Sequence, residues 1–511
     1  AMRKPQCALA WIPILCGAGS ELVEIYAKVG EKVLPLSWDP ATEDARFKSK
    51  KFAGLHDLPP FSSFFLHESL RIKFAEAASV AQAEDTPPDV TRLPIAASTP
   101  VGKPTHHKQS IIAIYQGHDA SIAISQNGRI QCVLELERFF NARYFRPNVR
   151  DPADKYQRTW HKALTAVENH CECEDGQKPH HFTDGVVVFA ADYESYQLFI
   201  RAVVGVVFTV DQWHMVDHHR AHALMGFHAS PFRSALVMSY DSAGNDGSFN
   251  VYVGSEGKVE RIAQLGLSLG GAYSLAALVM PEVTGNPLET YFNCSALKET
   301  SFGHTKAGYQ DKAVSAGAMS WAGKLMGYAA VGKPREELRR PVREMLESYE
   351  WMPGNHQLPL QLVETACESL EGQRAIAATM QEEFERFMKL RVEAFLHHVG
   401  IGTVEGIVLT GGCALNVLTN QVVHDTLSFA KPGGVKGLDP DFFVPMSPND
   451  SGLTVGGVWA ISPPVMQQRL QYVGFSLWDG DLLPQYARAR GARRLSRLGG
   501  VDYLAELLAG G

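Results

Sequence analysis

The stretch SALVMSYDSAGNDGSFNVYVGSEGKVERIAQL, residues 234–265, decides the fold. It begins as an apolar strand, passes through a polar Gly/Asp turn at 242–247 and continues as a second strand. A tight turn at Glu256-Gly257 then leads into a third strand. Glycine, asparagine and aspartate between short apolar runs are typical of hairpin connections. The stretch therefore predicts three consecutive strands joined by two tight turns.

The same order of features occurs earlier, in IIAIYQGHDASIAISQNGRIQCVLELE at residues 111–137. There the polar turn is His118-Asp119, and Asn127-Gly128 is a strong hairpin signal because both residues tolerate positive φ. Helices and apolar strands follow each copy. The predicted elements are a helix at 155–169 and a strand at 184–190, and later a helix at 374–399, a strand at 406–412, a helix from Ala414, a strand at 442–445 and a helix from about 451.

A duplicated three-strand unit with interleaved helices resembles the plan of the actin, hexokinase and Hsp70 superfamily. We therefore predict an α/β protein with a duplicated actin-like (ASKHA, ribonuclease H-like) fold of two similar lobes. A single doubly wound sheet is the alternative, which the two antiparallel hairpins make less favourable. A small helical extension is expected before the Ala/Pro/Ser/Thr-rich linker at 80–108. The predicted parts are an extension with linker, a first lobe, a second lobe and the start of a further domain, at 1–108, 109–232, 233–470 and 471–511.

The segment VDHHRAHA (216–223) places His218 and His222 four residues apart, on one face of a helix that follows a strand. Both imidazoles can then reach one ion. Asp241 ends the next strand and Asp450 precedes a helix, so two nitrogen and two oxygen ligands suited to Fe(II), Mn or Zn are expected to meet. The alternatives are a packed histidine cluster, a turn aspartate and a residue beside a helix N-cap.

Two glycine-rich turns are candidate nucleotide contacts. SAGNDGS (242–248), with Gly244, Gly247 and Ser248, offers backbone N–H groups to an anion. TGGCALN (410–416) joins a strand to a helix N-terminus through a glycine pair. Plain turns are the alternative for both. Cys413 is interpreted as a packed small residue, because no neighbouring base is evident.

His118 and Asp119 lie at the tip of the first hairpin, where the predicted fold directs them at the phosphates of a nucleotide. His118 is a candidate general base or substrate-orienting group, because the pKa of an imidazole lies near working pH. A turn that Asp119 merely stabilises is the alternative.

Composition narrows the classes of function. The net charge of −7 comes without a basic block, so no nucleic-acid partner is expected. No apolar run approaches the roughly 18 residues of a membrane-spanning helix. Eight scattered cysteines do not suggest a disulfide framework, and they favour a reducing, cytoplasmic location. Cys171 and Cys173, near His170, His180 and His181, match no standard zinc spacing, so a polar surface loop is preferred there.

Seven ordered motifs between residues 110 and 475 resemble the nodulation and antibiotic O-carbamoyltransferases. They are GHDASIAI with ELERF, VDHHRAHA, SYDSAGNDGS, LSLGGAY, GKLMG, LTGGCALN and FFVPMSPNDSG. By this resemblance His218, His222, Asp241 and Asp450 correspond to iron ligands. Gly411, Gly412 and Asn416 would line the adenosine of ATP, and Lys324 and Gly327 match the G-K-x-M-G segment. The actin-like domain of this family is related to the tRNA threonylcarbamoyl transferase.

The resemblance implies two reactions in two sites. A YrdC-like domain joins carbamoyl phosphate and ATP into carbamoyl adenylate, and the actin-like domain moves the carbamoyl group to a hydroxyl of a small acceptor. The sequence departs from the family at 141–143, which keeps one basic residue, and at an insertion near 283–320. It ends where the YrdC-like domain is expected to begin. We therefore expect no carbamoyl adenylate synthesis by this chain alone; a nucleotide- and metal-binding module, a tRNA-modifying enzyme, a sugar kinase and a homodimer stay open.

Overall fold

The computed structural model describes most of the chain. The described residues are 9–12, 24–29, 32–39, 44–47, 109–147, 152–171, 179–190, 197–299, 307–308, 314–348, 357–400, 402–429, 441–468, 470, 473–474, 482–493 and 495–509. The chain divides into two compact units. The first comprises 1–107, 147–162 and 202–206, and the second comprises 108–146, 163–201 and 207–511.

The first unit contains a four-stranded antiparallel sheet in chain order. Its strands are β1 (Leu9–Ile12), β2 (Glu24–Val29), β3 (Lys32–Asp39) and β4 (Asp44–Phe47). The expectation of a helical extension is wrong for these segments, which pair as hairpins. The predicted linker at 80–108 lies outside the described residues.

The first lobe is built on a five-stranded sheet of order β7-β6-β5-β8-β9. The strands are β5 (Ser110–Tyr115), β6 (Ser121–Gln126), β7 (Arg129–Glu135), β8 (His181–Val188) and β9 (Thr209–Val216). β5, β6 and β7 are antiparallel neighbours, whereas β8 runs parallel to β5 and β9 parallel to β8. Asn127 and Gly128 take positive φ in the β6–β7 turn, as predicted.

The second lobe repeats this plan with the order β12-β11-β10-β15-β16. Its strands are β10 (Ser234–Gly244), β11 (Gly247–Ser255), β12 (Lys258–Leu265), β15 (Gly406–Thr410) and β16 (Asp441–Phe443). Again three antiparallel strands are followed by two parallel ones. Two five-stranded sheets with the same order confirm the predicted duplicated α/β architecture, and they exclude one continuous doubly wound sheet among the described residues.

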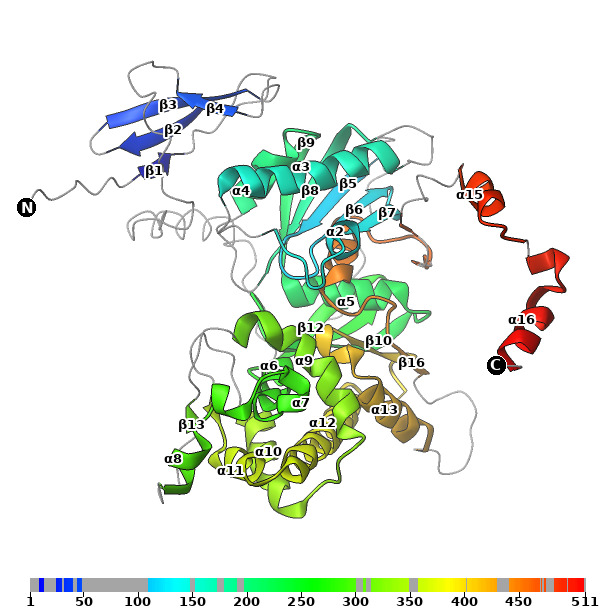
Figure 1. The fold of residues 1–511 in the computed structure, drawn as a ribbon. Helices are drawn as coiled ribbons and strands as arrows, with labels where there is room; N and C mark the ends of the chain where they lie inside the picture. Colours follow the sequence, from blue (N-terminus) through cyan, green and yellow to red (C-terminus); the bar gives the residue numbers. More distant parts are fainter. Residues whose placement is uncertain are drawn as a thin grey trace, which may run out of the picture. The chain divides into compact units, whose positions relative to one another are not determined.

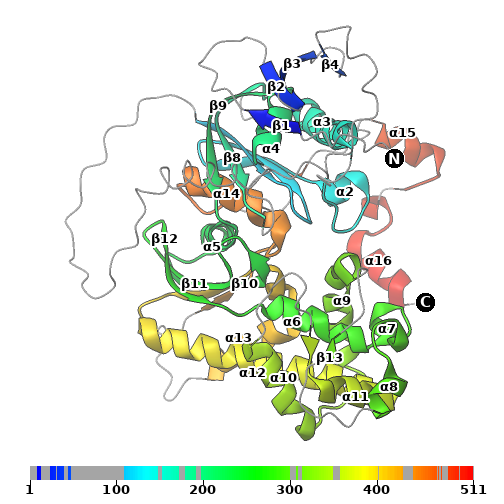
Figure 2. The same ribbon diagram turned by 90° about the vertical axis from the view of Figure 1, so that its left-hand side faces the viewer.

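Two helices lie between the sheets of the two lobes (Figures 1 and 2). α14 (Leu453–Ile461) packs on β5, β6 and β8 of the first sheet, and α5 (His218–Ala229) packs on β10, β11 and β15 of the second. The two helices also pack on each other. Their close approach requires Gly456, because a Cβ there would lie 1.9 Å from the backbone oxygen of Ala221. Each lobe thus contributes one helix to the interface.

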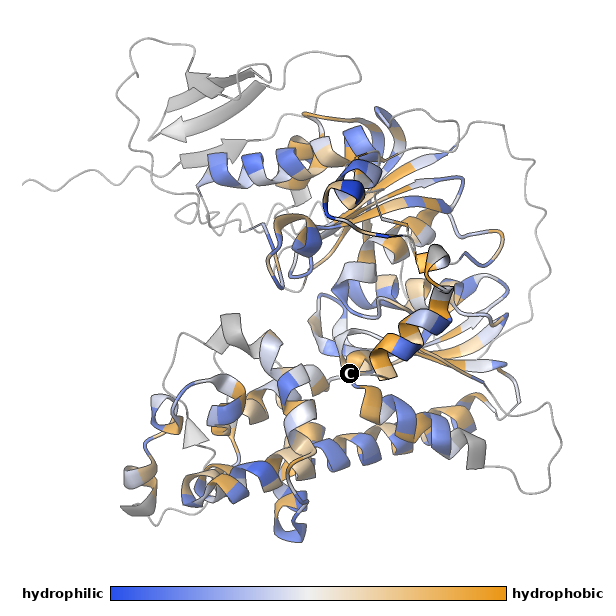
Figure 3. Ribbon diagram, turned by 45° about the vertical axis from the view of Figure 1, so that its right-hand side comes forward, coloured by the Kyte–Doolittle hydropathy of each residue, from blue (hydrophilic) through white to orange (hydrophobic). Residues whose placement is uncertain are grey.

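Helices cover the second lobe and enclose its main core. Figure 3 shows hydrophilic and hydrophobic residues alternating along them, as expected for helices with one buried face. α10 and α12 are joined by an ion-pair network in which Arg339 and Arg343 bind the buried Glu383. The elements are α6 (Leu269–Ala276), η4 (Ala277–Val279), α7 (Pro281–Thr284), η5 (Leu288–Thr290), α8 (Cys294–Glu299), β13 (Ala307–Gly308), α9 (Val314–Ala329), α10 (Glu336–Ser348), β14 (Gln357–Leu358), α11 (Leu360–Glu368), α12 (Leu370–Val399), η6 (Gly412–Leu415) and α13 (Val417–Phe429).

The other described helices lie in the first part of the chain and near its end. They are α2 (Leu136–Phe140), α3 (Ala153–His170), α4 (Gln197–Val204), η7 (Asp450–Gly452), α15 (Leu483–Ala489), η8 (Leu495–Arg497) and α16 (Gly500–Ala509). None of the described helices combines the length and the apolar character that crossing a membrane requires.

Two disulfide bonds contradict the expectation drawn from the cysteine spacing. Cys132 of β7 is bonded to Cys171, and Cys294 of α8 is bonded to Cys367 of α11. Cys171 is buried in this bond and is therefore no zinc ligand, while Cys173 lies outside the described residues. The spacing of the cysteines in the sequence did not predict these two bonds, because the bonded cysteines come from elements that only the fold brings together. The described part of the predicted insertion at 283–320 includes α8, which the second disulfide fastens to α11.

Candidate metal centre

The N-terminus of α5 lies at the carboxyl end of β9, and the β10–β11 turn caps it. Asp217 takes the extended N-cap conformation, but its side chain makes no capping bond. Instead the backbone N–H of His218 donates to Asn245 Oδ1 at 3.0 Å, and that of His219 donates to Asp246 Oδ1 at 2.9 Å. The hairpin of the second lobe therefore holds the first turn of a helix from the first lobe. This turn carries the first histidine of the predicted pair.

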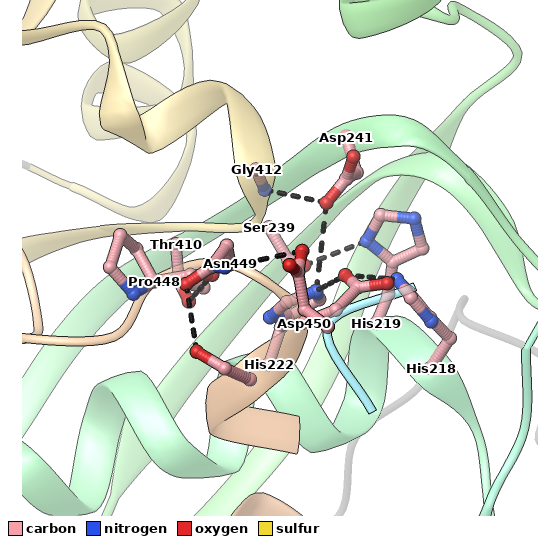
Figure 4. A network of polar contacts seen from close by, with 12 residues as sticks. His218, His219, His222, Ser239, Asp241, Thr410, Gly412, Pro448, Asn449 and Asp450 are labelled. Atoms are coloured by element: carbon pink, nitrogen blue, oxygen red, sulfur yellow. Dashed lines mark hydrogen bonds and ion pairs between the residues drawn. The ribbon is translucent and has the colours of Figure 1, made fainter. Parts of the chain in front are cut away.

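The four predicted metal ligands converge. One ligand atom from each of His218, His222, Asp241 and Asp450 lies within 4.8 Å of all the others, and all four residues are buried. His218 Nε2 lies 3.5 Å and His222 Nε2 3.3 Å from Asp450 Oδ1, and His222 Nε2 lies 3.7 Å from Asp241 Oδ2. Figure 4 shows the cluster where α5, β10 and the segment before α14 meet.

Hydrogen bonds orient the carboxylates of Asp241 and Asp450. Asp241 Oδ2 accepts from the backbone N–H of Gly412 at 2.5 Å, and its Oδ1 accepts from the N–H of Ser242 at 2.6 Å. Asp450 Oδ2 accepts from the hydroxyl of Tyr115. Burial alone would raise the pKa of Asp450, but the neighbouring imidazoles of His118, His218 and His222 outweigh it and hold this pKa well below its usual range.

The chemistry of the cluster fits a divalent cation. His218 Nε2, both ring nitrogens of His222 and Asp450 Oδ1 are buried and make no hydrogen bond of normal geometry. Buried polar atoms without partners are costly, and a metal ion would satisfy His218 Nε2, one ring nitrogen of His222 and Asp450 Oδ1. His218 Nδ1 lies 3.3 Å from the carbonyl oxygen of Phe189, to which it can only donate a hydrogen bond. The lone pair of the neutral ring therefore lies on Nε2, where a metal ion can bind. Burial also lowers the pKa of His218, which favours the neutral, ligating form.

The comparisons with known proteins now decide the family. A profile described as Carbamoyltransferase N-terminus matches residues 153–458. The chain belongs to the carbamoyltransferase N-terminus family. All four converging residues lie within the matched range, whereas Tyr115 and His118 precede it. The family membership confirms the resemblance to carbamoyltransferases; the nodulation or antibiotic subtype stays a prediction.

Several solved structures are similar at low identity. Full-length HypF in its phosphate- and nucleotide-bound form shares 15% sequence identity at a TM-score of 0.40. The match covers 69% of this chain and 46% of that HypF chain. HypF of T. kodakarensis shares 13% sequence identity at a TM-score of 0.39, and the match covers 69% of this chain and 47% of that HypF chain. The ethanolamine utilization protein EutJ of Carboxydothermus hydrogenoformans shares 10% sequence identity at a TM-score of 0.32. The match covers 71% of this chain and 91% of EutJ. The chain thus spans about half the length of the HypF chains, and no curated protein matches it.

His118 and Asp119 lie beside the metal-ligand candidates. His118 Nδ1 is 3.1 Å from Asp119 Oδ2, and His118 Nε2 is 3.4 Å from Asp450 Oδ2. Burial alone would lower the pKa of His118, but the charge of Asp450 and the contact with Asp119 outweigh burial and raise this pKa from 6.5 to about 9. Asp119 takes a positive φ of 58° in the turn, and its Oδ2 also accepts from Asn449 Nδ2 at 3.4 Å. Asp119 therefore contacts the imidazole from within the turn, and the catalytic roles of His118 and Asp119 stay predictions.

The first glycine turn packs against the histidines. β10 extends to Gly244 and β11 begins at Gly247, so the predicted loop is shorter than expected. A Cβ on Gly244 would lie 2.8 Å from the His219 ring and 2.9 Å from His218. This close approach and the capping of α5 explain the turn without a ligand. The nucleotide contacts of Gly244, Gly247 and Ser248 stay predictions.

The second glycine turn lies behind Asp241. Gly411 has a φ of 90°, and a Cβ there would meet the backbone oxygen of Tyr240 at 2.2 Å. Gly412 donates to Asp241, and the helix predicted from Ala414 starts as η6 and continues as α13 from Val417. Cys413 is half-buried and unbonded, and burial raises the pKa of its thiol, in keeping with a packed residue.

The remaining predicted nucleotide contacts lie on helices of the second lobe. Asn416 is buried, and its side chain exchanges hydrogen bonds of 3.0 Å with Gln381 of α12. Lys324 and Gly327 are exposed on α9, and a Cβ on Gly327 would meet nothing within 4 Å. The structure thus gives Asn416 a packing role, and the adenosine contacts of this group stay predictions.

His219 is a residue that sequence reasoning missed. It is fully buried between the two candidate ligands, with Nδ1 2.7 Å from Ser239 Oγ and Nε2 3.0 Å from the carbonyl oxygen of Gly247. Both nitrogens are thus engaged, so His219 fastens α5 to the β10–β11 hairpin rather than joining the ligand set. Its position inside VDHHRAHA was the available signal, but spacing alone could not separate it from its neighbours.

Proposed function

We propose that this chain is the acceptor-side part of an O-carbamoyltransferase, which transfers a carbamoyl group from carbamoyl adenylate to a hydroxyl of a small molecule. The observation that carries this proposal is the buried cluster of two histidines and two aspartates inside the range matched by the family profile. ATP-derived nucleotide and a divalent cation would bind beside α5, where the two lobes meet. Carbamoyl phosphate would reach the chain through a YrdC-like domain or protein.

In this proposal His218, His222, Asp241 and Asp450 hold Fe(II) or another divalent cation. The bound cation would supply Lewis acidity and an anchor for phosphate oxygens. His118, next to Asp450 and partly exposed, would orient the acceptor hydroxyl, because a pKa raised to about 9 keeps its ring protonated near neutral pH, and Asp119 fixes the ring. The glycine turns would supply backbone N–H groups to the nucleotide, and Lys324 would meet its phosphates.

A nucleotide- and metal-binding module without turnover is the second candidate. It requires only the buried cluster of four ligand candidates, without an acceptor site. A tRNA substrate has no comparable support, because the chain carries a net charge of −7. The cytoplasmic location suggested by the cysteines stays a prediction, and four of those cysteines are disulfide-bonded.

The first experiment measures metal content. The chain is stripped with a chelator, reloaded with Fe(II) or Mn²⁺ and analysed for bound metal. We expect one ion per chain, and we expect His222→Ala and His218→Ala to lose it. His228→Asn is the matched control, because His228 is a buried histidine of the same helix outside the cluster. Unchanged metal content in His222→Ala would remove these residues from the site.

The second experiment separates enzyme from module. ATP and carbamoyl phosphate are supplied with a panel of hydroxyl acceptors, with and without a separately purified YrdC-like domain. We expect carbamoylated product only when that domain is present, and loss of product in His118→Ala. Nucleotide and metal binding without product under all conditions would favour the module. Turnover of carbamoyl phosphate by the chain alone would contradict the two-site account.

A further inference from the structure

The two carboxylate oxygens of Asp450 face different neighbours. Oδ2 accepts a hydrogen bond from the hydroxyl of Tyr115, a buried residue at the end of the central strand β5. Oδ1 makes no hydrogen bond of normal geometry and lies 3.5 Å from His218 Nε2 and 3.3 Å from His222 Nε2. One oxygen is therefore held from the first sheet, and the other is presented to the imidazole pair.

The Tyr115 side chain has little freedom to move. β5 pairs with β6 on one side and with β8 on the other, so the strand end is fixed. The tyrosine ring meets the His218 ring edge-on, with the ring centroids 6.0 Å apart. The hydroxyl passes so close to Gly117 that a Cβ there would lie 2.1 Å from the phenol oxygen. The hydroxyl therefore reaches Asp450 only because residue 117 lacks a side chain.

The Tyr115 hydroxyl shares Asp450 Oδ2 with a second neighbour, His118. His118 Nε2 lies 3.4 Å from the same Asp450 Oδ2, on the exposed side of the cluster. If Tyr115 lost its hydroxyl, the carboxylate could rotate towards His118 and withdraw Oδ1 from the imidazole pair. A phenol O–H facing a carboxylate can only donate, so its hydrogen bond fixes one orientation without adding charge.

We propose that Tyr115 is a positioning residue for the metal centre, which orients Asp450 so that Oδ1 is available to a cation held by His218 and His222. This inference rests on the proposed function in so far as Asp450 is a ligand. Partners of metal-ligating carboxylates set the direction of the ligand atom, and their removal weakens metal affinity about 10- to 100-fold. Neither the family match nor the four converging residues include Tyr115.

The test compares Mn²⁺ binding by wild type, Tyr115→Phe and a control. Mn²⁺ is titrated into the chelator-stripped full chain, and free Mn²⁺ is followed by electron paramagnetic resonance. Tyr240→Phe is the matched control, because Tyr240 is fully buried beside Asp241 and its hydroxyl makes no hydrogen bond of normal geometry. We expect Tyr115→Phe to raise the dissociation constant about 10- to 100-fold, and Tyr240→Phe to leave it near the wild-type value.

A second variant and a second readout separate positioning from folding. Gly117→Ala keeps the tyrosine but displaces its hydroxyl, so we expect the same loss of affinity. The thermal unfolding midpoint of each metal-free variant is measured in parallel, and we expect Tyr115→Phe to differ from wild type no more than Tyr240→Phe does. Wild-type affinity in both Tyr115→Phe and Gly117→Ala, or an equal loss in Tyr240→Phe, would overturn the inference. Absence of Mn²⁺ binding by the wild type would instead refute the metal site itself.

Discussion

Glu383 shows how a single carboxylate is held in the core of the second lobe. It is fully buried in α12, and its oxygens accept hydrogen bonds from Arg339 at 2.8 Å, Arg343 at 2.6 Å and Arg386 at 2.8 Å. Burial would raise the pKa of this carboxylate, but hydrogen bonds from Arg343, Arg339 and Arg386 outweigh it and lower the pKa from 4.5 to about 2. The ion pairs join α10 to α12, so one side chain links two elements.

The lowered pKa predicts acid lability. A carboxylate whose pKa is lower in the folded state stabilises the protein above its unfolded pKa of 4.5, and this stability is lost as the pH falls through about 2. Glu383→Gln should lose about 3–5 kcal/mol of unfolding free energy at pH 7, because three arginines lose their shared partner. The difference from wild type should shrink between pH 5 and pH 2.

Urea unfolding at several pH values measures this prediction. Glu344→Gln is the control, because Glu344 lies on α10 and pairs with Arg340 at an exposed position. We expect the control to change stability much less than Glu383→Gln. A constant difference between wild type and Glu383→Gln across this pH range would contradict the linkage to this carboxylate.

At the scale of elements, the β10–β11 hairpin has two functions. It forms the first strands of the second lobe, and its turn caps α5 through Asn245 and Asp246. The two lobes are therefore joined at the helix that carries His218 and His222. The predicted polar loop is a two-residue turn whose side chains accept the free N–H groups of a helix, and its contacts with a nucleotide stay a prediction.

Removal of this cap should destabilise the protein and disturb the cluster. Asp246 accepts from the backbone N–H groups of His219 and Arg220 at 2.9 and 3.3 Å. Asp246→Ala should lower the free energy of unfolding by about 0.5–2 kcal/mol and weaken metal binding, because the first turn of α5 frays. Glu260→Ala, at an exposed position of β12 in the same three-strand unit, is the control. Equal stability of the two variants in denaturant titrations would refute the capping role.

At the scale of the whole molecule, the candidate centre joins parts that are distant in the sequence. Tyr115 comes from β5 of the first sheet, Asp241 from β10 of the second, and Asp450 directly precedes α14. The Tyr115–Asp450 hydrogen bond spans 335 residues of sequence. A ligand bound here would therefore stabilise both lobes together rather than one element.

Metal removal should lower the stability of both lobes. A cation present at 100 times its dissociation constant adds about 2.7 kcal/mol to the folded state. We expect a chelator to lower the thermal unfolding midpoint of the Mn²⁺-loaded wild type, and to leave His222→Ala unchanged because that variant binds no ion. Calorimetry measures both midpoints. A chelator effect of equal size in His222→Ala would show that the stabilising ion binds elsewhere.

The sequence alone determined the features that depend on local periodicity. The duplicated strand–turn–strand–turn–strand pattern predicted both sheets, because side-chain alternation and Asn-Gly turns are properties of neighbouring residues. Spacing by one helical turn predicted that His218 and His222 share a face, and strand ends predicted the nearby aspartates. The structure brings all four ligand candidates together.

Only the tertiary structure decided contacts between distant segments. Tyr115 and Asp450, the disulfide partners Cys132 and Cys171, and the capping of α5 by Asn245 all join elements whose proximity no local pattern encodes. A tyrosine at a strand end or an isolated cysteine looks the same in sequence whether it is packed, bonded or functional. The physical reason is that hydrogen bonds and disulfides depend on atoms meeting within a few ångströms, which the packing of the two lobes determines.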